Sequence, residues 1–174
     1  MHSPKYVIVM GVSGSGKSTI GEALASATGW VFIEGDDFHS AADKEKMAAG
    51  VALDDADRWP WLQAIRSWIT ETARHGQSAI ISCSALKRSY RDLLRGDGKN
   101  VYFCHLEADA DVLAKRISHR VDHFMSRALL HSQFITLEPL QADEQGIVVS
   151  ALGSVPQITA EVIERLGLPT DSPR

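Results

Sequence analysis

Short apolar runs alternate with amphipathic stretches along most of the chain. The runs that have the length and hydrophobicity of buried strands are Tyr6–Met10, Trp30–Ile33, Ala79–Cys83, Val101–Leu106 and Gly146–Ser150. Between them, apolar residues recur at helical spacing, so that strands and helices alternate. This order predicts an α/β fold with a parallel sheet, helices on both faces, and ligands bound at the carboxyl ends of the strands.

The helices expected between these strands have recognisable ends. The first helix ends at Gly29, the second spans Ala41–Ala49, and the third runs from Pro60 to Gly76. The fourth ends at Gly96, the fifth begins after Asp109, the sixth ends near Pro139, and the seventh spans Pro156–Leu166. Pro60 is placed at a helix start because the first turn leaves its N–H groups unpaired. Residues 53–58 are read as a charged loop, and the tail, about 168–174, is expected to fray. Residues 1–174 are expected to form a single domain.

The composition is that of an ordinary globular protein. Of its 174 residues, 44% are hydrophobic and 23% are charged. The net charge of −4 argues against a nucleic-acid partner. No apolar run approaches the roughly 20 residues of a membrane span, and no apolar signal segment begins the chain, so we expect a cytoplasmic protein without a membrane partner. Cys83 and Cys104 lie in or at the end of apolar runs, where buried thiols are common.

One segment carries a pattern that binds nucleoside triphosphates. It joins the first strand to the first helix and consists of Gly11, Val12, Ser13, Gly14, Ser15, Gly16, Lys17, Ser18 and Thr19. Its glycines allow the backbone to curl so that successive N–H groups point at phosphate oxygens, and the helix N-terminus adds positive charge. Lys17 is expected to reach the β- and γ-phosphates, and the Ser18 hydroxyl to ligate Mg²⁺.

The residues after the second strand separate a kinase from other nucleotide-binding proteins. The chain lacks the Asn-Lys-x-Asp sequence of switch GTPases and the Asp-Glu pair of motor domains. The second strand instead ends in Glu34 and Asp36, which strand periodicity puts on the same side. A carboxylate there can accept a proton from a substrate hydroxyl, so Asp36 is the candidate base. The alternative, a solvated loop acid or a helix cap, is preferred for Asp37.

The segment Gly11–Thr19, which we call the phosphate loop, and the sequence Glu34-Gly35-Asp36-x-x-His39 together resemble the gluconate kinase family of small phosphate-loop kinases. Further matches are Asp55-x-Asp57-Arg58-x-Pro60-Trp61-Leu62, Cys83–Lys87, Tyr90-Arg91-Asp92, His123-Phe124-Met125 and Ser132-Gln133-Phe134-x-Thr136-Leu137-Glu138. The resemblance covers roughly residues 6 to 139. It departs at Asp122, where the family usually has glycine, and at Ala52, where it usually has proline.

The resemblance implies phosphorylation of D-gluconate to 6-phospho-D-gluconate by ATP with Mg²⁺, usually by a homodimer. It also implies the sheet order 2-3-1-4-5 and a small lid at about 119–127. The residues that it places against gluconate are Asp36, His39, Arg58, Lys87, Arg91 and His123. Arg116 and Arg120 resemble lid arginines that bind ATP, with Arg120 catalytic beside Lys17 and Asp36, and Glu34 is assigned to the Mg²⁺ site through water.

Interpretations without a catalytic or binding role stay open for several of these residues. Arg58, Lys87 and Arg91 are each read alternatively as solvated charges, and Arg116 with Arg120 as a basic helix face. Two other functions also stay open. One is a kinase of the same fold that acts on shikimate or another hydroxy acid. The other is a non-catalytic nucleotide-binding protein, which would bind ATP without acceptor-dependent release of ADP.

Overall fold

A parallel sheet forms the centre of the protein in the computed structural model, which describes residues 3–118 and 127–171. The five strands are β1 (Tyr6–Met10), β2 (Val31–Glu34), β3 (Ala79–Ser82), β4 (Val101–Glu107) and β5 (Gly146–Ser150). All neighbouring strands pair in parallel, in the order β2-β3-β1-β4-β5. The α/β fold and the sheet order that the sequence analysis expects are therefore confirmed.

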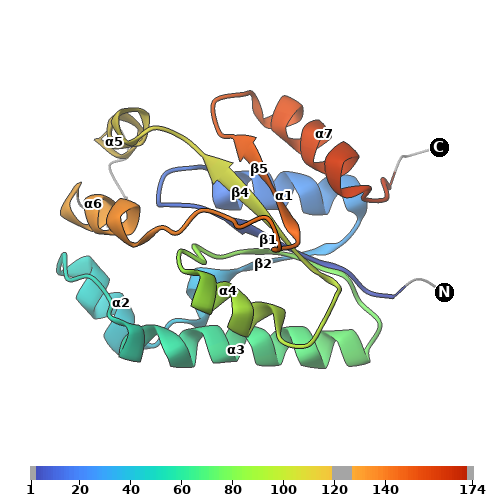
Figure 1. Ribbon diagram of the computed structural model, residues 1–174, viewed down its shortest axis with the longest axis horizontal. Coiled ribbons are helices and arrows are strands. Elements are labelled where there is room, and N and C mark those ends of the chain that lie inside the picture. The colour runs from blue at the N-terminus through green and yellow to red at the C-terminus, as the bar shows by residue number, and fades with distance from the viewer. Residues whose placement is uncertain (1–2, 119–126, 172–174) are drawn as a thin grey trace.

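Helices cover both faces of this sheet and also stand beyond its carboxyl edge. They are α1 (Lys17–Thr28), the 3-10 helix η1 (Gly35–Phe38), α2 (Ala41–Ala48), α3 (Asp55–Arg74), α4 (Arg88–Arg95), α5 (Ala110–Ser118), α6 (Arg127–Thr136) and α7 (Val155–Leu166). Helices α1 and α7 pack on one face, and α3 and α4 on the other (Figure 1). The strands point toward α2, α5 and α6, and the chain termini lie at the opposite end (Figure 1).

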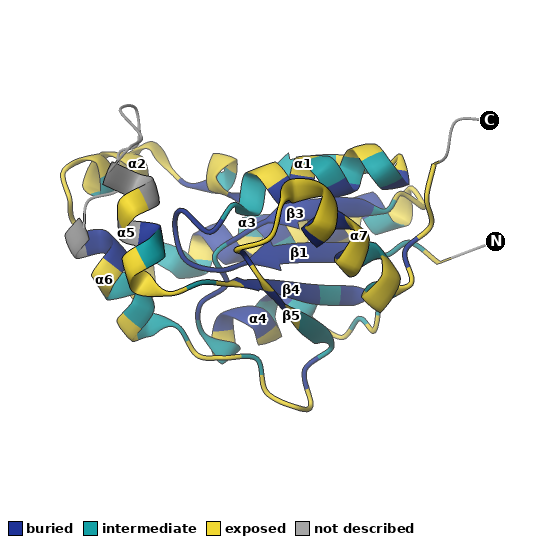
Figure 2. Cartoon of the chain, turned by 90° about the horizontal axis from the view of Figure 1, so that it is seen from above, coloured by how far each residue is buried: buried dark blue, intermediate teal, exposed yellow. Residues whose placement is uncertain are grey.

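The central strand β1 explains why the strand sequences read as continuous apolar runs. Every residue of β1 is fully buried. Tyr6 and Ile8 pack with α3 and α4, whereas Val7 and Val9 pack with α1 and α7. A parallel strand that is covered on both faces has no solvent side, so polar residues do not alternate along it. Figure 2 shows the central strands as buried and the outer faces of the helices as exposed.

Helix α3 begins earlier than the sequence analysis expects. It starts at Asp55, and Pro60 lies inside it. The Asp54 side chain accepts a hydrogen bond from the Asp57 N–H, and the Asp57 side chain accepts one from the Asp54 N–H. This capping box starts the helix, and Pro60 removes only one internal hydrogen bond close to the N-terminus. The supposed loop at 55–58 is therefore the first turn of α3, so Arg58 is held on a helix.

The expectation of a frayed tail at 168–174 is wrong for its described part. Leu168 is 7% exposed and packs in the core with α1 and α7. The Asp171 N–H donates a hydrogen bond to the Ala27 carbonyl at 2.7 Å. Residues 172–174 lie outside the described ranges, as does most of the expected lid, 119–126.

Both cysteines are buried free thiols, as their apolar surroundings predict. Burial raises the pKa of Cys83 and of Cys104 to about 12, so both stay protonated at neutral pH. Within residues 3–118 and 127–171, no helix combines the length and the hydrophobicity needed to cross a bilayer.

Candidate active site

The phosphate loop between β1 and α1 has the curled backbone that its glycines predict. Gly11, Gly14 and Gly16 have positive φ angles of 145°, 83° and 97°. A Cβ atom on Gly11 would lie 2.8 Å from the carbonyl oxygen of Leu106, so a larger residue would push the loop off β4. The Lys17 Nζ donates a hydrogen bond to the Val12 carbonyl at 3.1 Å, so its ammonium lies over the loop itself.

Glu34 joins the phosphate loop to the end of β2. Its carboxylate accepts hydrogen bonds from the Ser18 hydroxyl and, at 2.5 Å, from the Ser82 hydroxyl. The described residues contain no group of three or more histidines, cysteines or acids that would enclose a metal ion. Mg²⁺ needs no such group because it binds few carboxylates and keeps water and phosphate ligands. Ser18 and Glu34 therefore fit a magnesium ion that is held mainly by nucleotide phosphates and water.

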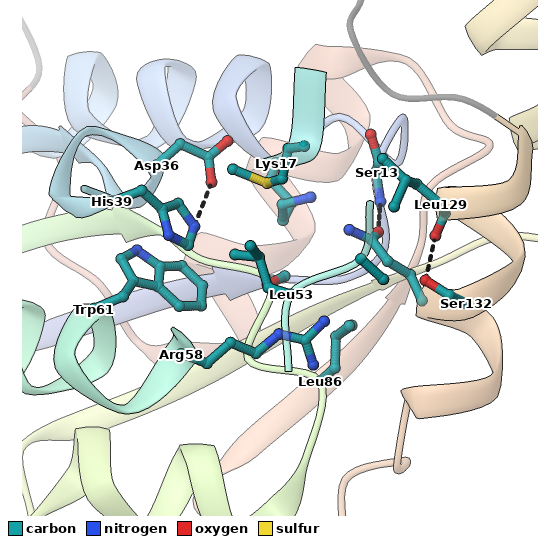
Figure 3. Close-up of a pocket in the computed structure, with 14 residues that line it drawn as sticks. Ser13, Lys17, Asp36, His39, Leu53, Arg58, Trp61, Leu86, Leu129 and Ser132 are labelled. Atoms are coloured by element: carbon teal, nitrogen blue, oxygen red, sulfur yellow. Dashed lines mark hydrogen bonds and ion pairs between the residues drawn. The ribbon is translucent and has the colours of Figure 1, made fainter. Parts of the chain in front are cut away.

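An open cavity with about 740 Å³ of empty space, which includes solvent at its mouth, lies beside the phosphate loop. Its lining residues are Ser13, Lys17, Asp36, His39, Met47, Ala52, Leu53, Arg58, Trp61, Ser84, Leu86, Leu129, Ser132 and Gln133. Asp36, His39 and Trp61 lie on one side of it, and Ser13, Leu129 and Ser132 on the other, with Lys17 between them (Figure 3). The cavity thus brings the phosphate-loop lysine, a carboxylate and the Arg58 cation together.

His39 is buried and fixed in the wall of this cavity. Its ring stacks on Trp61 with 4.0 Å between ring centroids, and the Trp61 indole N–H donates to the Gly35 carbonyl at 2.8 Å. Its Nδ1 lies 3.4 Å from an Asp43 carboxylate oxygen, and its Nε2 lies 3.8 Å from one of Asp36. Burial lowers the pKa of His39, against the opposing effect of these two carboxylates. The ring is therefore neutral at pH 7 and orients toward Asp36.

The lowered pKa of His39 predicts a loss of stability in acid. The unfolded chain binds a proton near the ordinary pKa of 6.5, whereas the folded protein takes it up only at lower pH. The stability that the neutral ring contributes is complete above pH 6.5 and is lost as the pH falls through the folded-state pKa. Between about pH 7.5 and pH 5.5, the unfolding free energy of the native protein should therefore fall more than that of His39→Gln. Urea denaturation at both pH values measures this difference.

The exposed Gln63 supplies a control that removes no titrating group. The Gln63→Met variant should lose as much stability in acid as the native protein. A His39→Gln variant with an unchanged pH dependence would contradict the buried, neutral state of His39.

Arg58 and Lys87 both lie over the Tyr90 ring, but of the two only Arg58 lines the cavity. The Arg58 Nη1 donates to the Tyr90 hydroxyl at 3.0 Å, and that hydroxyl donates to Asp55. Lys87 Nζ lies 3.0 Å from the same Asp55 carboxylate. Hydrogen bonds from Tyr90 and Lys87 lower the pKa of Asp55 and keep it ionised. Asp55 therefore already partners Lys87, whereas the Arg58 guanidinium extends along the cavity toward Leu86 (Figure 3).

Arg91 does not face the cavity, so its expected contact with substrate needs correction. Its side chain is fully buried and lies 2.6 Å from Glu144 in an ion pair. Its guanidinium also donates to the carbonyls of Ala85 and Leu86. Arg91 thus connects α4, the segment before β5 and the loop that carries Leu86 to the cavity. Its sequence position beside the strand end gave no sign of Glu144, which lies 53 residues away in the chain.

This buried pair predicts a stability effect for Arg91→Met. The variant leaves the Glu144 carboxylate buried without its cation, which costs about 3–5 kcal/mol of unfolding free energy. The double variant with Glu144→Leu should recover much of the loss because it removes the stranded charge. Urea denaturation measures both.

Arg95→Ala on the same helix is the control, because the side chain of that partly exposed residue pairs with the exposed Asp92. It should cost less than about 1 kcal/mol. A stable Arg91→Met protein with a raised KM for substrate would instead restore the original assignment of Arg91.

The expected lid residues are only partly within the described structure. Arg116 belongs to α5. Arg120 and His123 lie outside the described residues. Their roles therefore stay predictions.

A second cavity, of about 520 Å³, adjoins the other side of the phosphate loop. It is lined by Gly14, Ser15, Gly16, Thr19, Ile20, Ala151, Gly153, Val155 and Ile158. The sequence offered no sign that the loop after β5 would meet the phosphate loop. It also missed Trp61, Leu53 and Gln133 as cavity residues. For Gln133 a signal existed, because it belongs to the Ser132–Glu138 match, but no chemistry was attached to it.

Comparisons with known proteins agree with this geometry. The AAA domain family matches residues 7–139. The gluconokinase of Gluconobacter oxydans 621H is 48% identical over 147 residues, which cover 84% of this chain and 83% of that protein. A sugar kinase from Janibacter sp. HTCC2649 has a TM-score of 0.91 at 45% identity, over 95% of both chains. A gluconokinase from Sinorhizobium meliloti 1021 has a TM-score of 0.85 at 42% identity, over 96% of this chain and 94% of that one.

Proposed function

The chain belongs to the gluconokinase family of P-loop kinases, and on this premise we propose how its residues phosphorylate D-gluconate with ATP. The observation that carries the proposal is the single cavity lined by Lys17, Asp36 and Arg58. In this cavity Lys17 offers a cation for phosphate, Asp36 an acceptor for a proton, and Arg58 a cation for a carboxylate. The product is 6-phospho-D-gluconate.

The phosphate loop binds the triphosphate of ATP on the side of the cavity where Lys17 lies. Its backbone N–H groups and the N-terminus of α1 stabilise the phosphate charges. Lys17 stabilises the negative charge on the β- and γ-phosphates as the bond between them breaks. Ser18, with Glu34 through water, would hold Mg²⁺, which would supply positive charge to the phosphate oxygens. The base and ribose of ATP occupy the second cavity, between the phosphate loop and the loop after β5.

Gluconate lies in the first cavity with its carboxylate on Arg58 and its C6 hydroxyl toward Asp36. Asp36 accepts the proton of this hydroxyl while the hydroxyl oxygen bonds to the γ-phosphorus. The bond from that phosphorus to the β-phosphate oxygen breaks, and ADP leaves. His39 stays neutral and hydrogen-bonds a gluconate hydroxyl, and Trp61 fixes its ring. Lys87 acts through Asp55 and Tyr90, which position Arg58.

Arg116 and Arg120 complete the proposal as cations on the transferring phosphoryl group. Their support is their spacing of one helical turn in a basic segment and the family resemblance. We assign His123 to the same segment as a gluconate contact, and we expect the protein to work as a homodimer.

The order of acceptors tests this function. A coupled assay of ADP release should give gluconate a kcat/KM about 10²-fold or more above that of glucose, which has similar hydroxyls but no charge for Arg58. Shikimate keeps the carboxylate but is a rigid ring, so it cannot reach Asp36 and His39 together. It should also be a poor acceptor.

The Arg58→Ala variant should narrow the advantage of gluconate over glucose while the KM for ATP changes little. Equal turnover of glucose or shikimate would overturn the assignment of gluconate. ATP binding without any acceptor-dependent ADP release would indicate a non-catalytic nucleotide-binding protein.

A further inference from the structure

Helix α6 extends one side chain onto the phosphate loop. The Ser13 backbone N–H donates a hydrogen bond of 2.6 Å to the Gln133 Oε1, across 120 residues of sequence. Since the donor is an N–H, the amide atom that faces it must be the oxygen. This bond therefore fixes the orientation of the Gln133 amide, and its NH₂ group points away from Ser13.

The same side chain lines the cavity that we assign to gluconate. Leu129 and Ser132 of α6 lie on the side opposite Asp36 and His39 (Figure 3), and Gln133 of the same helix lines the cavity with them. Ser132 donates its hydroxyl back to the Leu129 carbonyl. Among the described residues, the hydrogen bond that the Gln133 amide makes is the one its Oε1 accepts, and its NH₂ group donates none. Gln133 is thus the α6 side chain that offers hydrogen-bond donors to a ligand in the cavity.

The chemistry of these donors selects the group that they bind. The Arg58 cation in the same cavity suits the gluconate carboxylate. A neutral amide N–H suits a neutral hydroxyl oxygen, and Gln133 stands next to the phosphate loop, where the reacting end of gluconate must lie. The hydroxyls nearest that end are those on C4 and C5.

We propose that Gln133 is a specificity-determining residue whose NH₂ group binds the C4 or C5 hydroxyl of gluconate while its Oε1 holds the Ser13 N–H of the phosphate loop. The proposal rests on the proposed function, because it needs gluconate in this cavity. One amide then connects the acceptor to the phosphate loop. An acceptor without that hydroxyl leaves the Gln133 donors without their partner in the cavity, which lowers the kcat/KM of that acceptor.

Deoxy analogues of gluconate test this proposal in combination with Gln133→Met, which keeps the side-chain length and removes both polar groups. In the native protein, either 4-deoxygluconate or 5-deoxygluconate should have a kcat/KM about tenfold below that of gluconate through loss of this bond. In Gln133→Met, gluconate itself should lose about tenfold, and that analogue should lose nothing further. The effect of removing the C2 hydroxyl should be equal in both proteins.

A second variant separates the two contacts of Gln133. Gln133→Glu keeps an oxygen for the Ser13 N–H but has no N–H donors, so it should also lose the discrimination against that analogue. Gln63→Met, the same change at an exposed position of α3, should behave like the native protein.

Two outcomes would overturn the proposal. In the first, both variants still discriminate fully between gluconate and the deoxy analogue. In the second, Gln133→Met lowers kcat/KM by the same factor for every acceptor and raises the KM for ATP. In either case Gln133 only braces α6 against the phosphate loop. A native protein that does not phosphorylate gluconate would remove the proposed function, and this inference with it.

Discussion

Replacing Lys17 by alanine should lower kcat by about 10³-fold or more while the protein stays folded. The ammonium lies over the phosphate loop, where it donates a hydrogen bond to the Val12 carbonyl. The core between α1 and β1 is built from other side chains, among them Val9, Ile20 and Leu24, so the loss of Lys17 leaves it intact. The variant loses a positive charge that stabilises the β- and γ-phosphates in the transition state. Steady-state ADP release and urea denaturation of the same preparation measure both parts of the prediction.

Lys99→Ala is the matched control, because Lys99 is exposed in the turn before β4. It removes the same charge and should leave kcat and stability unchanged. A Lys17→Ala protein with near-normal turnover would contradict the assignment of the phosphate loop to catalysis.

Replacing Asp36 by asparagine should lower kcat by 10²-fold or more, within the range of about 10²–10⁴ that general-base catalysis contributes. The substitution keeps the size of the side chain and removes the proton acceptor. Asp36 lies in the first turn of η1, directly after Gly35, which passes so close to β3 that a Cβ on it would lie 2.1 Å from the Ser82 carbonyl oxygen. ATP binding should change little, because Asp36 belongs to the wall opposite Ser13 (Figure 3). Full kinetics in ATP and gluconate separate these effects.

The neighbouring Asp37 provides the control, since it is exposed and does not line the cavity. Asp37→Asn should retain native kcat. If Asp36→Asn keeps kcat and only the KM for gluconate rises, Asp36 binds substrate and another group accepts the proton.

The sheet could be predicted from the sequence because its determinants are local. Each strand is a continuous apolar run, and a glycine or a capping residue marks the end of each helix whatever the helix packs against. Pro60 is a poorer marker of the start of α3 than the Asp54–Asp57 capping box, which lies before it in the sequence. Both signals were local, and the capping box satisfies two otherwise unpaired N–H groups, whereas the proline costs one hydrogen bond.

Topology predicts the site residues that lie in the segments after the strands, whereas Arg58 of α3 was expected from the family resemblance. Lys17 lies in the segment after β1 and Asp36 in the segment after β2, so topology places them together. Arg91 belongs to α4, which follows β3, but its side chain turns inward to Glu144, which only the folded protein brings close. Gln133 reaches Ser13 from a helix 120 residues away in the chain. Such contacts depend on tertiary packing, and no pattern along one sequence specifies them.

The central claim is that gluconate binds in the cavity between Asp36 and the phosphate loop with its C6 hydroxyl at Asp36. A crystal structure of the protein with gluconate and a nonhydrolysable ATP analogue tests it most directly. We predict the C6 oxygen within about 2.6–3.2 Å of the Asp36 carboxylate, facing the γ-phosphorus, with the gluconate carboxylate on Arg58. Gluconate bound in another place, or in this cavity with C6 turned away from Asp36, would contradict the account.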